Sequence, residues 1–364
     1  MAATPLRYQP AFETPEPDEA ETQRELVETL EGIIRTVYED SGHALRSVHA
    51  KSHGLLQGEL RVLGGLPEAL AQGLFRHPAT YPVILRISTN PGDILDDSIG
   101  LPRGLAMKVL GVEGARVPGD SGGTVQDFVM VNGPAFAVPN AKKFLGTLKL
   151  LAKTTDSPQV LKKAVAAVLR GAEATVEAVG GESATLKTLG GHPRTHPLGE
   201  TFYTQVPILY GPYMAKLSLA PVSPALKALK DQAVETGGHP DALREAINAY
   251  FAKQGGEWEL RVQLCTDLET MPIEDASVLW PEEESPYRAV ATLSVPRQTG
   301  WSKGRAKVVD DRLSFSPWHA LADHRPLGSV MRARKPAYEA SAALRSRLNG
   351  CPLHAPAPSE RLPA

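Results

Sequence analysis

The sequence predicts an α+β fold, in which an antiparallel β-barrel carries helical insertions. Short runs that alternate apolar and polar residues, as half-buried strands do, recur along most of the 364-residue chain. Helical spacing of apolar residues is found near the start, in the middle and at the end. Regular strand–helix alternation and a Gly-rich phosphate loop are both missing from the sequence, which argues against a doubly wound nucleotide-binding fold.

Composition narrows the class of protein further. Hydrophobic residues make up 42% of the chain and charged residues 22%, which is ordinary for a globular protein. The net charge of −2 offers no basic field for a polyanion, so we expect no nucleic acid as partner. No run approaches the roughly 18–20 apolar residues of a membrane span, and the Pro- and acid-rich start is unlike a secretory signal. We therefore expect a cytoplasmic protein without an integral membrane span.

The first half of the chain is predicted to contain one long helix followed by strands. Residues 1–20 hold four prolines and few large apolar residues, and suit an extended N-terminal arm. From residue 18 to 39, apolar residues recur at helical spacing with acidic residues early, and this helix ends near Ser41-Gly42. Strands are predicted at residues 58–63, 82–88, 105–112 and 128–131.

The second half begins with a helical insertion, after which strands resume. Helices are predicted at residues 140–151, 158–179, 240–253 and 329–348, and strands at 201–209, 213–219, 257–264 and 288–295. Residues 190–197 and 298–310 are too irregular to assign. We expect one domain over residues 21–349 and a flexible C-terminal tail at 350–364.

Two histidines four residues apart stand out in Arg46-Ser-Val-His-Ala-Lys-Ser-His-Gly54, which should enter a strand. Such a pair could bind a metal on one face of a helix. Gly54 and the β-branched Val48 weaken that helix, and no Glu lies between the histidines as a zinc protease would need. A metal site is the weaker interpretation of this segment.

Arginines mark two further candidate segments. In Leu85-Arg-Ile-Ser-Thr-Asn-Pro-Gly92, Arg86 alternates with Ile87, so the guanidinium should point away from the core toward an anion. In Arg334-Lys-Pro-Ala-Tyr338, a guanidinium and a phenol lie four residues apart and share one face of a helix. Because Pro336 cannot donate a hydrogen bond, we expect it in the first turn of that helix. A surface Tyr packed on an Arg stem is the simpler alternative.

Several of these segments together resemble the haem catalases, in the order in which that family has them. Val48-His-Ala-Lys51 is similar to the Val-His-Ala-Lys at the distal histidine, and Arg86-Ile-Ser-Thr89 to an Arg-Phe-Ser-Thr segment. Further similar segments are Pro102-Arg-Gly-Leu-Ala-Met-Lys108, Asp127-Phe-Val, Asn132-Gly-Pro-Ala-Phe136, residues 258–263, Glu269-Thr-Met-Pro272, Val278-Leu-Trp-Pro281 and the Arg334–Tyr338 motif. The resemblance covers residues 40–349, and is patchy across the helical insertion and from 180 to 255.

The resemblance implies a role for each of ten residues around a buried haem of the b type. Tyr338 would be the axial ligand of the iron as a phenolate, and Arg334 would hold it ionised, because an ordinary phenol has a pKa of about 10. His49 would move the peroxide proton, oriented by Ser88. The other implied contacts are the haem propionates for Arg46, Arg86 and Arg345, the haem face for Val48 and Phe144, and the peroxide for Asn132.

The implied activity is that of an oxidoreductase: a haem hydroperoxidase that cleaves hydrogen peroxide or organic hydroperoxides, including lipid hydroperoxides. In an ungapped alignment the distal asparagine of catalases falls on Val131, and Asn132 aligns one residue later. This departure, and a chain shorter than typical catalases, favour peroxidase chemistry on organic hydroperoxides over fast dismutation. Two alternatives stay open, namely rearrangement of a fatty-acid hydroperoxide, as in allene oxide synthases, and haem binding without turnover. The sequence leaves a homo-oligomer open and offers no basic and aromatic cluster for NADPH.

Overall fold

The computed structural model describes residues 4–120, 122–152 and 192–364. The helix predicted at residues 158–179 lies outside these residues. None of the described helices is both long and apolar enough to cross a membrane.

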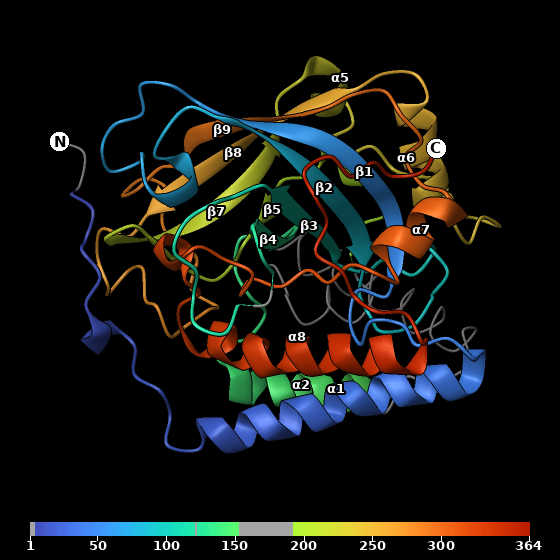
Figure 1. The fold of residues 1–364 in the computed structure, drawn as a ribbon, viewed down its shortest axis with the longest axis horizontal. Coiled ribbons are helices and arrows are strands. Elements are labelled where there is room, and N and C mark those ends of the chain that lie inside the picture. The colour runs from blue at the N-terminus through green and yellow to red at the C-terminus, as the bar shows by residue number, and fades with distance from the viewer. Residues whose placement is uncertain (1–3, 121, 153–191) are drawn as a thin grey trace, which may run out of the picture.

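Within the described residues, the strands form one antiparallel sheet that closes into a barrel (Figure 1). Eight strands complete the ring in the order β5-β4-β3-β2-β1-β9-β8-β7, and the pairing of β5 with the end of β7 closes it, while the short β6 pairs with the start of β7. The strands are β1 (Lys51–Val62), β2 (Thr80–Thr89), β3 (Arg103–Leu110), β4 (Val125–Val131), β5 (Phe202–Tyr203), β6 (Ile208–Tyr210), β7 (Tyr213–Pro221), β8 (Gly256–Leu264) and β9 (Arg288–Val295). The predicted fold class is confirmed.

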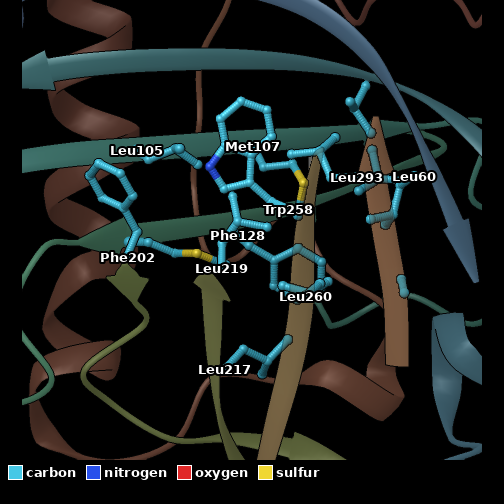
Figure 2. Close-up of a cluster of buried hydrophobic side chains, with 14 of the residues drawn as sticks. Leu60, Leu105, Met107, Phe128, Phe202, Leu217, Leu219, Trp258, Leu260 and Leu293 are labelled. Atoms are coloured by element: carbon cyan, nitrogen blue, oxygen red, sulfur yellow. The ribbon is translucent and has the colours of Figure 1, made fainter. Parts of the chain in front are cut away.

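The interior of the barrel is filled by the alternate side chains of its strands. On β8, Trp258, Leu260 and Val262 are buried, whereas the side chains between them are exposed or half-buried. Figure 2 shows Trp258 and Leu260 among apolar side chains of β1, β3, β4, β5, β7 and β9. The period of two that predicted these strands therefore separates the core from the outer face.

Three helices lie together on one side of the barrel (Figure 1): α1 (Glu19–Ser41), α2 (Ala141–Ala152) and α8 (Ser329–Leu348). α1 buries Leu26, Leu30 and Ile33 against residues of the other two. It ends where Gly42 takes a φ of 69°, a left-handed conformation that glycine adopts without steric cost. Outside this layer, the described helices of four or more residues are α5 (Pro224–Lys227), α6 (Ala242–Phe251) and α7 (Lys303–Val309).

Three details of the prediction needed correction. Residues 201–209 form two short strands, because Gln205 takes a φ of 63° and Pro207 has no N–H to donate to a ladder. Residues 298–310, which we could not assign, contain α7. Pro336 lies inside α8 and not in its first turn, since the helix begins at Ser329.

Both ends of the chain contact the barrel. In the N-terminal segment, the amides of Leu6 and Tyr8 donate to the carbonyls of Cys265 and Pro212, each at 2.8 Å. In the C-terminal segment, the Leu362 amide donates to Gln57 at 2.7 Å. The division into arm, domain and tail remains a prediction.

Candidate haem cavity

A cavity of about 270 Å³ is bounded by barrel strands and by α8. Seven of the ten residues that the sequence singled out line it, although they come from three segments far apart in the chain. These seven are Arg46, Val48 and His49 before β1, Arg86 and Ser88 on β2, and Tyr338 and Arg345 on α8. The fold thus brings the phenol and the histidine to one cavity.

His49 is held in a strained conformation over a glycine. Its φ of 54° is uncommon for a residue with a side chain, and such backbones concentrate at functional sites. We had expected His49 to lie on a strand, but it lies just before β1. The ring sits against Gly104 of β3, where a Cβ would come within 2.7 Å of Cε1 and Nδ1. Only glycine at this position leaves room for the imidazole.

The imidazole of His49 is neutral over the physiological range. Burial, reinforced by the positive charges of Arg86 and Arg334, lowers its pKa to about 3. Ser88 Oγ lies 3.4 Å from His49 Nδ1, a long contact of the kind that can orient the ring. A neutral imidazole with one nitrogen engaged by a hydroxyl can accept a proton on the other.

Arg86 and Ser88 reach the cavity because of the two-residue period of β2. Ile87 lies between them and packs in the barrel core, so its neighbours point to the opposite face. The sequence had placed Arg86 opposite Ile87 for the same reason, and this prediction is confirmed. Both Arg86 and Ile87 are nonetheless buried, because α7 and the residues after it cover the outer face of β2 here.

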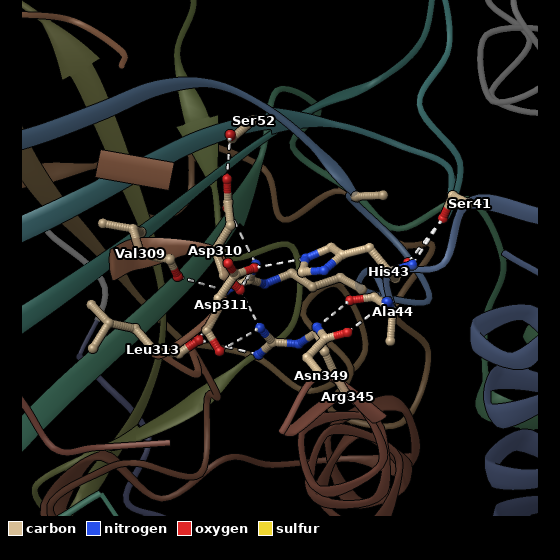
Figure 3. Close-up of polar contacts among 12 residues, drawn as sticks. Ser41, His43, Ala44, Ser52, Val309, Asp310, Asp311, Leu313, Arg345 and Asn349 are labelled. Atoms are coloured by element: carbon tan, nitrogen blue, oxygen red, sulfur yellow. Dashed lines mark hydrogen bonds and ion pairs between the residues drawn. The ribbon is translucent and has the colours of Figure 1, made fainter. Parts of the chain in front are cut away.

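Three arginines, Arg46, Arg86 and Arg345, gather around Asp310, and we call them the guanidinium cluster. Arg86 Nε donates to Asp310 Oδ1 at 2.7 Å, and Arg46 Nη1 lies 3.2 Å from the same oxygen. Arg345 donates to the main-chain carbonyls of residues 310, 311 and 313 (Figure 3). Among the described residues, Asp310 is the one carboxylate that these guanidinium groups contact.

Charge in the guanidinium cluster is unbalanced. Burial disfavours the ionised form of Asp310, but Arg86 and Arg46 outweigh it and hold the pKa of that carboxyl below its usual value. Burial also lowers the pKa of Arg345 to about 10, and its Nε is buried without a hydrogen-bond partner. Three guanidinium groups and one carboxylate leave a surplus of positive charge, which an anion at the edge of the cavity would neutralise.

Tyr338 lines the cavity from α8, but Arg334 does not contact its hydroxyl. The Arg334 guanidinium lies 5.7 Å from the centroid of the Phe136 ring, and Nη1 lies 3.7 Å from the sulphur of Met331. The expected Arg334–Tyr338 pair is therefore not formed in this structure. The ring of Phe136 offers the cation a competing partner.

Phe144 and Asn132 are not among the residues that line the cavity. Phe144, on α2, packs on Phe136 with ring centroids 5.3 Å apart. Asn132 follows the end of β4, and its side-chain amide donates to Glu200 Oε2 at 2.7 Å. The expectation that Asn132 supplies the distal hydrogen bond is not met, because its amide is committed elsewhere.

Asp310 and His319 are site residues that reasoning from the sequence did not identify. His319 lines the cavity, and its Nδ1 lies 2.9 Å from Asp127, which also accepts both hydrogen bonds from Lys108 at 2.7 Å. Asp310 follows α7, in the segment we could not assign. Each is a single polar residue without a local pattern, so only its neighbours in space identify it.

Comparisons with known proteins address the fold. No protein-family model matches the sequence, and no curated protein matches it in a sequence search. Among solved structures, a fungal catalase matches with a TM-score of 0.61 and 18% identity, over 87% of this chain and 63% of the catalase. The chain has a catalase-like fold.

Two further catalases give the same result. Catalase A from Saccharomyces cerevisiae matches with a TM-score of 0.60 and 15% identity, over 85% of this chain and 63% of that one. A bacterial catalase matches with a TM-score of 0.58 and 16% identity, over 90% and 62%. The similarity to catalases that the motifs suggested is confirmed for the fold, and the catalase-like chain spans less than two thirds of the length of these relatives.

Proposed function

We propose that this catalase-like chain is a haem-dependent hydroperoxidase whose iron is bound by the Tyr338 phenolate. The observation behind the proposal is that Tyr338, His49 and the guanidinium cluster line a single cavity. The substrate is hydrogen peroxide or an organic hydroperoxide, and the reaction cleaves its O–O bond.

The residues of the cavity fit a haem in three respects. The Tyr338 phenol is an iron ligand of a known type, and iron itself favours its anionic form. The neutral His49 ring is free to act as a base because it is not protonated. The surplus positive charge of the guanidinium cluster, with the unpartnered Arg345 Nε, suits the two propionates of a haem b.

A haem held by Tyr338 and the guanidinium cluster would supply the two electrons that cleave the O–O bond. His49 Nε2 accepts the proton of the hydroperoxide and returns it to the departing oxygen, which leaves as water or as an alcohol. Ser88 holds the ring through Nδ1, so that Nε2 faces the peroxide. With a pKa of about 3, His49 is in its basic form before each turnover.

The lining of the cavity favours an organic hydroperoxide. Leu105, Val129 and Met130 stand on the wall formed by β3 and β4, and Val131 occupies the aligned position of the distal asparagine. An apolar wall binds an alkyl group and offers no hydrogen bond to a second molecule of hydrogen peroxide. The same wall would accept a fatty-acid hydroperoxide, so rearrangement of that hydroperoxide is the second candidate reaction. Product analysis separates reduction from rearrangement, because only reduction yields the corresponding alcohol.

The first experiment is an absorption spectrum of the haem-supplemented wild type and of Tyr338→Phe. We expect a Soret band with high-spin ferric features in the wild type that is lost or shifted in the variant. Tyr81→Phe removes a phenol outside the cavity and serves as the matched control. A wild type that takes up no haem, or a Tyr338→Phe spectrum identical to the wild type, would refute the tyrosinate site.

Activity is then measured with hydrogen peroxide and with cumene hydroperoxide. We expect reduction of the organic hydroperoxide to be faster than oxygen release from hydrogen peroxide. Rapid dismutation without use of organic hydroperoxides would contradict the role assigned to the apolar wall.

A further inference from the structure

A second cavity, of about 370 Å³, adjoins the candidate haem cavity. Arg46 and Arg345 line both cavities, so their side chains form a shared wall. The other residues of the second cavity include Ser52, Arg244, Trp301, Lys303, Lys307 and Asp311. A molecule bound here would be separated from the haem cavity by one layer of side chains.

The second cavity carries a surplus of positive charge. Five arginines and lysines line it against two aspartates, although the chain as a whole has a net charge of −2. Lys303 and Lys307 lie one turn apart on α7, are exposed, and contact no carboxylate among the residues that the structure describes. A concave site with unpaired charge of one sign concentrates small ions of the other sign.

Polar contacts connect the second cavity to the guanidinium cluster. Trp301 lines the cavity and carries the Arg244 guanidinium 3.7 Å from its ring centroid. Its Nε1 donates to Ser52 Oγ at 2.9 Å, and Ser52 Oγ donates to Asp310 Oδ2 at 2.7 Å. Asp310 in turn holds Arg46 and Arg86 (Figure 3 shows the Ser52–Asp310 bond). An aromatic ring and its hydrogen-bonded chain thus link this cavity to the edge where haem propionates would lie.

We propose that the second cavity binds a small monoanionic organic reductant, which supplies the electrons for the peroxidase reaction. The inference rests on the proposed function. Reduction of a hydroperoxide to an alcohol and water takes up two electrons and two protons. Two reductant anions, each giving up one electron and one proton, supply both and leave as radical anions. Lys303 and Lys307 attract the anion, and the shared wall of Arg46 and Arg345 brings it next to the candidate haem cavity.

Paired substitutions at exposed lysines test the proposal. Lys303→Gln/Lys307→Gln removes two charges from the cavity, and Lys227→Gln/Lys230→Gln removes two exposed charges outside both cavities. The reductants are ascorbate, a monoanion at neutral pH, and guaiacol, a neutral phenol. We expect the cavity variant to raise the KM for ascorbate about three- to tenfold. The KM for guaiacol and for cumene hydroperoxide should stay unchanged in both variants. Equal effects on ascorbate and guaiacol, or equal effects of the two double variants, would overturn the proposal.

Calorimetric titration of the haem-free protein with ascorbate separates failure of this inference from failure of the proposed function. Saturable binding that weakens in Lys303→Gln/Lys307→Gln and not in the control supports the anion site, even for a protein without peroxidase activity. Absence of saturable binding to the wild type overturns the site, even if the holoprotein reduces hydroperoxides. Retained binding together with an inactive holoprotein refutes the role as a reductant site.

Discussion

Replacement of Gly104 by alanine tests the position of His49 without removing any catalytic group. The added Cβ would lie 2.7 Å from Cε1 and Nδ1 of His49, whereas non-bonded carbon atoms prefer about 3.5–4.0 Å. The ring must therefore move by about 1 Å, since Gly104 lies within a strand paired on both sides. A displacement of that size at a reacting group can reduce the rate about 100-fold.

The assay is the initial rate of cumene hydroperoxide reduction per bound haem, with haem content taken from the Soret band. We expect Gly104→Ala to bind haem and to lose roughly 100-fold in rate, with a loss of about 1–3 kcal/mol in the free energy of unfolding from overpacking. Gly146→Ala is the control, because a Cβ at this exposed position of α2 meets nothing within 4 Å. A Gly104→Ala protein with the wild-type rate per haem would show that His49 does not act on the peroxide.

Two further predictions concern charge. Asp310→Asn removes the carboxylate that Arg46 and Arg86 contact. Because buried cations are then left unpaired, the free energy of unfolding should fall by about 3–5 kcal/mol. Denaturant titration of the haem-free protein measures this loss, and an unchanged midpoint would contradict the described contacts. The pH dependence follows from the pKa of about 3 for His49. His49 takes up a proton near pH 6.5 in the unfolded chain but only near pH 3 in the folded protein. Its contribution to the free energy of unfolding is therefore fully present above pH 6.5 and is lost as the pH falls toward 3. His49→Gln should therefore lose less stability than the wild type between pH 7 and 4, and identical pH profiles would refute the lowered pKa.

The predicted strands and helices were mostly found because their signals are local. β8 was recognisable because Trp258, Leu260 and Val262 alternate with polar residues, and α1 because its apolar residues share one face and Gly42 follows. One exception depended in part on a single backbone conformation. No local sequence pattern predicts the φ of 63° at Gln205, which helps to divide one expected strand into two.

The candidate site was predicted in part: the sequence identified residues that belong to motifs, but it did not predict the contacts of every side chain. The motifs identified His49, Arg86 and Tyr338, which all line the cavity. A motif can do this because it consists of a residue and its immediate neighbours in the sequence. Motifs also suggested Asn132 and the Arg334–Tyr338 contact, but the orientation of these side chains depends on Glu200 and Phe136, which come from other parts of the chain.

The sequence by itself determined the fold class, most of the strands and helices, and seven residues of the cavity, because periodicity and motifs are properties of neighbouring residues. Only the tertiary structure decided that Asp310 lies within the guanidinium cluster, that Gly104 supports the His49 ring and that a second basic cavity adjoins the first. These are contacts between segments up to 264 residues apart, as between Arg46 and Asp310. They arise when closure of the barrel and docking of α8 and α7 fix the distances between side chains, and no local pattern encodes those distances.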